Sequence, residues 1–113
     1  MNTSSISVAA VIRTNVPRQS IRKDFMSKFT DYLCESFNTD IKHTNVEIHA
    51  DVLMMRGGLS TPMMNISLYH NTNVISQTTK VNNAEPIAKF MAEEMKIPID
   101  RVLVLFFDTR KCT

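Results

Sequence analysis

The side chains best suited to catalysis or metal binding are few in this chain, and they lie far apart in the sequence. Its 113 residues include three histidines and two cysteines. Cys34 and Cys112 form no CxxC pair and have no histidine at a zinc-ligand spacing. The histidines fall in different predicted elements, and the acidic residues form no spaced catalytic pair; these residues are His43, His49, His70, Asp40, Asp51, Glu93 and Glu94. We therefore expect no metal and no cofactor.

The composition is that of one ordinary globular domain. Hydrophobic residues make up 43% of the chain, and the net charge is only +2, with basic and acidic residues interspersed. This pattern argues against a nucleic-acid partner. The longest apolar run, residues 102–107, is much shorter than a membrane span, and the first residues lack the basic region of a signal peptide. Cys34 lies in an apolar helical pattern, so cysteine usage favours a reducing compartment.

The apolar pattern predicts two helices. In residues 20–37 an apolar side chain recurs at every fourth position, which marks one buried helix face. Its members are Ile21, Phe25, Phe29, Leu33 and Phe37. A second helix is predicted over residues 83–96, with Pro86 in its first turn, where a proline is tolerated.

Four strands complete the pattern. They are predicted over residues 6–14, 46–52, 63–69 and 101–108. The last is apolar on both faces, so it needs cover on both sides of the sheet. The order is strand, helix, strand, repeated once, which predicts an α+β domain of two βαβ units. The four-stranded sheet then carries both helices on one face.

Four short motifs lie in a fixed order over nearly the whole chain. They are Thr14-Asn15-Val16-Pro17-Arg18, Val46-Glu47-Ile48-His49, Arg56-Gly57-Gly58-x-Ser60-x-Pro62, and Ile97-Pro98-x-Asp100-Arg101-Val102 running into Phe107-Asp108. With these motifs the chain resembles the family of macrophage migration inhibitory factor and D-dopachrome tautomerase. The resemblance implies a tautomerase fold, a homotrimer and no cofactor.

The resemblance also implies a mechanism that this chain departs from. In the family, the first strand begins with a proline that is the free N-terminus and the catalytic base for keto–enol tautomerisation. Counted back from Pro17, that proline falls on Val8, behind a seven-residue extension (residues 1–7). The family's pocket tyrosine and asparagine correspond to Leu103 and Leu105. The pocket lysine corresponds to Lys42 or is lost at Ile41, because the preceding segment differs in length.

These departures predict a protein that has lost tautomerase activity and acts as a cytokine-like binding protein. The resemblance implies a cytoplasmic protein that is also secreted without a signal peptide. Two alternatives remain: a phenylpyruvate or dopachrome tautomerase with an altered site, and an intracellular modulator that forms mixed trimers with active paralogues. The expected partners are other copies of the chain and a cell-surface receptor or paralogous subunits. Leu103 and Leu105 are interpreted as core or subunit-interface residues.

Overall fold

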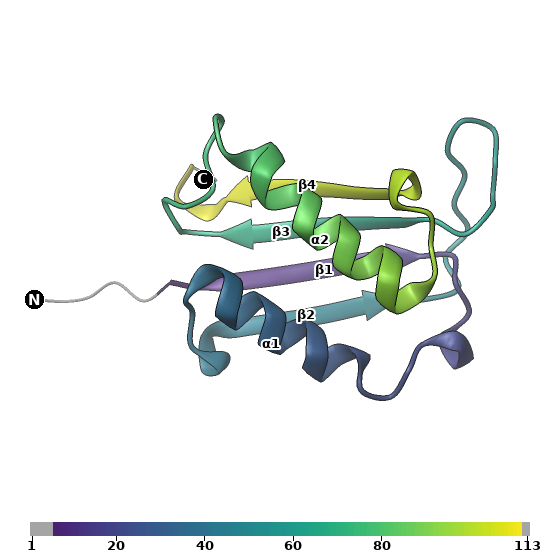
Figure 1. The fold of residues 1–113 in the computed structure, drawn as a ribbon, viewed down its shortest axis with the longest axis horizontal. Coiled ribbons are helices and arrows are strands. Elements are labelled where there is room, and N and C mark those ends of the chain that lie inside the picture. Colours follow the sequence, from purple (N-terminus) through teal and green to yellow (C-terminus); the bar gives the residue numbers. More distant parts are fainter. Residues whose placement is uncertain (1–5, 112–113) are drawn as a thin grey trace, which may run out of the picture.

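A four-stranded mixed sheet forms the centre of the molecule (Figure 1). The computed structural model describes residues 6–111, so most of the expected extension and Cys112 lie outside the described residues. The strands are β1 (Val8–Thr14), β2 (Thr44–His49), β3 (Met64–His70) and β4 (Val102–Asp108), in the order β2-β1-β3-β4. β1 is parallel to β2, β3 is parallel to β4, and the central pair β1 and β3 is antiparallel.

Each parallel pair is joined by a crossover that contains one helix. Helix α1 (Phe25–Phe37) lies between β1 and β2, and α2 (Lys80–Met95) lies between β3 and β4. Both helices cover the same face of the sheet (Figure 1). The predicted pair of βαβ units with both helices on one face is therefore confirmed. Neither described helix is long and apolar enough to cross a membrane.

The helix starts differ from the sequence prediction. Helix α1 begins at Phe25 rather than at residue 20, because a 3-10 turn (Arg18–Ser20) and a further bend precede it. Helix α2 begins at Lys80, three residues before the predicted start. Pro86 therefore lies inside the helix and not in its first turn. A polar network at Ser76 and Thr79 explains the earlier start, because the Lys80 amide donates to the Ser76 carbonyl.

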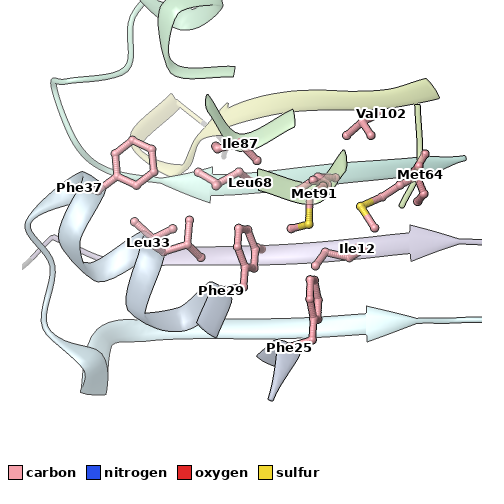
Figure 2. Close-up of a cluster of buried hydrophobic side chains, with 14 of the residues drawn as sticks. Ile12, Phe25, Phe29, Leu33, Phe37, Met64, Leu68, Ile87, Met91 and Val102 are labelled. Atoms are coloured by element: carbon pink, nitrogen blue, oxygen red, sulfur yellow. The ribbon is translucent and has the colours of Figure 1, made fainter. Parts of the chain in front are cut away.

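The core lies between the sheet and the two helices. Phe25, Phe29, Leu33 and Phe37 of α1 are all buried, as their fourfold spacing predicted. Figure 2 shows side chains from both helices gathered over the strands, among them Ile87 and Met91 of α2, Ile12 of β1 and Leu68 of β3. The Phe29 and Phe90 rings, 5.5 Å apart between centroids, join α1 to α2. This single core of interlocked apolar side chains supplies most of the driving force for folding.

The opposite face of the sheet is not covered by any of residues 6–111. Side chains alternate strictly between the two faces, so β4 points Val102 to the core and Leu103 to the open face. On that open face Leu103, Leu105 and Phe107 are 39%, 46% and 37% exposed. The Phe107 ring stacks on Tyr69 of β3 at 5.0 Å between centroids. The open face is therefore apolar along β4 and polar along β2, where Glu47 and His49 pair.

Candidate functional site

Val8 is a core residue at the start of β1. Its neighbours in the sheet are Thr44 of β2 and His70 of β3, and its side chain is only 1% exposed. The preceding residue is also held, because the Ser7 amide donates to Asn71 Oδ1 at 2.8 Å. The nitrogen of Val8 is thus a peptide nitrogen inside a continuous strand. A peptide nitrogen has no basic lone pair, so this position cannot accept a proton.

A shallow hollow of about 320 Å³ lies beside Val8. Lys42 lines this hollow and comes from the 3-10 turn Ile41–His43, which follows α1. The carboxylate of Asp40 fixes that turn by accepting a hydrogen bond from the Lys42 amide at 3.2 Å. Ile41 is 63% exposed and does not line the hollow. The structure therefore brings Lys42, and not Ile41, to the same hollow as Val8.

Leu103 and Leu105 lie elsewhere. Both are on β4, two strands away from β1, and both point to the open face. Leu103 lies beside Asn65 and Leu105 beside Ser67 in the register of β3 and β4. Neither leucine lines the hollow beside Val8. Within one chain, Val8 and Lys42 therefore share a hollow, whereas the two leucines that are predicted to complete the family's pocket lie outside it.

The opposite end of the sheet holds the densest polar network. Asn15, which follows β1, donates through Nδ2 to the carbonyls of Ser60 and Thr61 and accepts from the Met63 amide at 2.9 Å. The hydroxyl of Thr14 donates to the Met63 carbonyl at 2.7 Å. The segment that leads into β3 is thus fixed by two residues of the first sequence motif.

Arg101 fixes the neighbouring loop in the same way. Its guanidinium donates to the carbonyls of Arg56, Leu59 and Thr61, each at 3.1 Å. Arg56 returns a hydrogen bond to the Arg101 carbonyl at 2.9 Å. Between Arg56 and Leu59, Gly57 and Gly58 adopt φ angles of 63° and 75°, a left-handed conformation that favours glycine. Sequence reasoning recognised these motifs but missed that they contact one another.

The histidines do not form a joint site. His43 is in the turn before β2, His49 pairs with Glu47 on the open face, and His70 is buried at the end of β3. Among residues 6–111, no three His, Cys, Asp or Glu side chains are arranged to hold a metal ion. The burial of His70 was missed, although its phase with Met64, Ile66 and Leu68 is the signal that marks it as inward-facing.

Sequence comparison decides the family. A family model described as macrophage migration inhibitory factor (MIF) matches residues 9–113. The chain belongs to the macrophage migration inhibitory factor family. The MIF-like protein mif-2 of Caenorhabditis elegans is 28% identical over 102 residues, covering 90% of this chain and 84% of that protein. Macrophage migration inhibitory factor of Rattus norvegicus is 28% identical over 98 residues, covering 87% of this chain and 84% of that protein.

Solved structures of MIF proteins share the fold. The macrophage migration inhibitory factor of Trichinella spiralis superposes with a TM-score of 0.82 at 17% identity, over 88% of each chain. The protein from Oncomelania hupensis gives the same TM-score and identity, over 88% of this chain and 72% of that one. At this identity the likeness establishes the tautomerase fold and leaves the chemistry to be argued from the residues themselves.

Proposed function

We propose that this chain is a MIF-family binding protein with a cytokine-like role, and that it has lost keto–enol tautomerase activity. One observation carries the proposal: Val8, to which we assign the position of the family's catalytic proline, is buried in a continuous strand and offers only a peptide nitrogen. Tautomerisation needs a base that removes a proton from the carbon beside a carbonyl and returns it elsewhere. Without that base, the reaction has no first step at this site.

The other pocket positions do not replace the missing base. Lys42 lines the hollow as a cation, which can attract an anionic substrate but takes no proton while it is charged. Leu103 and Leu105 are hydrocarbon side chains, so neither can donate a hydrogen bond to a substrate carbonyl or an enolate oxygen. The polar groups that would bind and orient a small keto acid are therefore absent from three of the four positions.

The open face of the sheet supports a homotrimer. A row of exposed apolar side chains on β4, reinforced by the stacked Tyr69 and Phe107 rings, forms an apolar patch of the kind that marks protein interfaces. In the resembled family, three sheets close around a central channel, which would cover this face. Sedimentation at micromolar concentration should give three times the chain mass of 12.9 kDa. A monomer mass would contradict the trimer.

The binding role rests on the surfaces that remain outside such a trimer. We propose as candidates the Arg56–Leu59 loop, residues 71–83 and the tail from Arg110. Residues 71–83 expose Val74 and Val81, at 52% and 61%.

A pull-down from secretions and from cell extract distinguishes the two binding hypotheses. Receptor ectodomains support the cytokine-like role, whereas co-purifying paralogues support the alternative of a modulator in mixed trimers. Recovery of neither contradicts both.

Loss of activity is tested directly by assaying the intact chain with phenylpyruvate. We expect a rate no higher than that of the solvent reaction, and the same rate for Val8→Ala, because neither protein has a base at residue 8. Turnover well above the solvent rate would contradict the proposal and favour the altered-tautomerase alternative.

A further inference from the structure

A second hollow, of about 250 Å³, lies at the carboxyl ends of β3 and β4, beside the segment that leads into α2. It shares no lining residue with the hollow beside Val8 and Lys42. The Phe106 ring of β4 supplies its aromatic wall, because the Phe107 ring points to the open face and stacks on Tyr69. Ile75 and Ser76 approach from the segment before α2. The hollow therefore combines an aromatic wall with polar groups, as small-molecule sites do.

His70 gives this hollow a buried donor. Its side chain lines the hollow, although the residue is only 2% exposed. The Nδ1 atom accepts a hydrogen bond from the Thr72 amide at 3.2 Å, which assigns the proton of the neutral ring to Nε2. Among the residues that the structure describes, no group accepts a hydrogen bond from Nε2. Burial lowers the pKa of His70, so the ring is neutral near pH 7 and presents one N–H donor.

The charges around the hollow favour an anion. Asp108 is the acidic residue in its lining, and Arg110 holds that carboxylate through two contacts of 2.9 Å. The hydrogen bonds from Arg110 also hold the pKa of Asp108 well below its usual range. With Asp108 paired in this way, the ammonium groups of Lys80 and Lys111 leave the hollow positive. Lys80 is the first residue of α2, where the helix dipole adds further positive potential.

We propose that this hollow binds a small organic oxyanion, a carboxylate or a phosphate monoester, that carries a compact apolar group. The oxyanion contacts Lys80 and Lys111 and accepts a hydrogen bond from Nε2–H of His70, while the apolar group packs against the Phe106 ring. The volume is smaller than that of a drug-sized pocket, which limits the ligand to about one ring. This site goes beyond the proposed binding role and does not depend on the loss of tautomerase activity.

Three probes separate the parts of this proposal: benzoate, its neutral isostere benzamide, and inorganic phosphate. We expect amide resonances of residues 75–80 in the NMR spectrum of the full chain to shift with benzoate, at a dissociation constant on the order of millimolar. Benzamide lacks the charge and phosphate lacks the apolar group, so both should bind several-fold more weakly. Equal binding of benzoate and benzamide, or no shift with benzoate, would overturn the proposal. If phosphate bound as tightly as benzoate, the proposed contact between the apolar group and the Phe106 ring would be overturned.

Two surface substitutions test the site without disturbing the core. Lys80→Gln and Lys111→Gln should each weaken benzoate binding about two- to fivefold at low ionic strength, which is the usual strength of an exposed charge contact. Lys89→Gln is the matched control, because Lys89 is exposed on the same helix and lines neither hollow. Equal affinities for the Lys80→Gln, Lys111→Gln and Lys89→Gln variants would place the bound benzoate elsewhere and overturn the assignment.

Discussion

The two ends of the sheet differ in how their side chains interact: one end is held by a hydrogen-bond network, and the other by apolar packing. At the end where β1 finishes and β3 and β4 begin, Asn15 and Arg101 bind the backbone of residues 56–63 through a dense set of hydrogen bonds. At the other end, Val8 is packed into the core beside a shallow hollow lined by Lys42. Parts of three of the four motifs that carry the family likeness meet at the first end, namely Asn15, residues 56–61 and Arg101. The likeness in sequence is therefore largely a likeness of scaffold.

A physical reason explains this asymmetry. Asn15 accepts from the Met63 amide, so replacing Asn15 leaves that amide unsatisfied. Arg101 adds a charged donor to the carbonyls of Arg56, Leu59 and Thr61, which also accept hydrogen bonds from the loop backbone or from Asn15, so its replacement loosens the loop. Val8 differs, because its buried apolar side chain needs no hydrogen-bond partner. Under our proposal, the chemistry at one end can be lost without loss of stability, provided that the network at the other end is unchanged.

The largest expected effect is at Arg101. Arg101→Met keeps the aliphatic stem but removes three hydrogen bonds from a charged donor to loop carbonyls, so we expect the free energy of unfolding to fall by about 2–4 kcal/mol. Urea unfolding of the parent protein and the variant measures this difference in the free energy of unfolding. Arg22→Met is the matched control, because its side chain is 68% exposed and its pairing with Asp24 is worth little. Equal stability of the two variants would show that the loop network is not structural.

Asn15→Ala should have the next largest effect. The substitution leaves the Met63 amide without its acceptor, removes the Asn15 donor from the Ser60 carbonyl, and leaves the Thr61 carbonyl with Arg101 as its donor. We expect a loss of roughly 1–3 kcal/mol. Hydrogen exchange should show faster opening of residues 59–63 than of β1. Unchanged protection of this segment would contradict the account.

Val8→Ala sharpens the contrast between the two ends. Removing buried methyl groups at a residue with 1% exposure should cost roughly 1–2 kcal/mol, and we expect tautomerisation to stay at the solvent rate. Val81→Ala, at an exposed position of α2, should stay within about 0.5 kcal/mol of the parent protein. A stability change at Val8 no larger than that at Val81 would show that Val8 is not a core residue.

The smallest effect is a pH dependence from His70. Its pKa is lowered in the folded state, mainly by burial, while Asp108 raises it and Arg110 and Lys111 lower it. The unfolded chain therefore binds a proton first, and stability falls as the pH drops below about 6.5. The depressed pKa of Asp108 acts only at more acidic pH, below 3.8, so the two windows are separate.

Thermal unfolding across this range measures the His70 effect. His70→Gln should flatten the curve between about pH 5 and 7, whereas Val81→Ala should not, because this exposed substitution removes no titratable group. The same slope in all three proteins would contradict the assignment to His70.

Sequence patterns predicted the fold because its elements follow simple periods. The fourfold apolar spacing of α1 and the alternation in β2 are local properties, so element type and order could be read without tertiary information. The residue at which each helix starts could not be predicted in this way. Ile21 continues the apolar spacing of α1, but it lies in a bend before Phe25. Pro86 was misplaced because the start of α2 is set by Ser76 and Thr79, whose hydrogen bonds are not visible in an apolar pattern.

The candidate site was only partly predictable. The assignment of Val8 to the catalytic-proline position is a prediction made by counting back from the Thr14-Asn15 motif along β1 without a gap. The placement of Lys42 depends on a turn of altered length and needed the structure. The meeting of Asn15, Arg56 and Arg101 depends on contacts between residues more than 40 positions apart, which no local pattern encodes.

The most direct test of the central claim is the rate of phenylpyruvate tautomerisation by two forms of the protein, each verified by intact mass. The full chain should show no turnover above solvent, because Val8 has no basic nitrogen. The form that begins at Val8 exposes a primary amine with a pKa of about 8 and should gain only slight activity, given Leu103 and Leu105. Strong turnover by the full chain, unaffected by substitution of Val8, would contradict the claim that this scaffold has lost its chemistry.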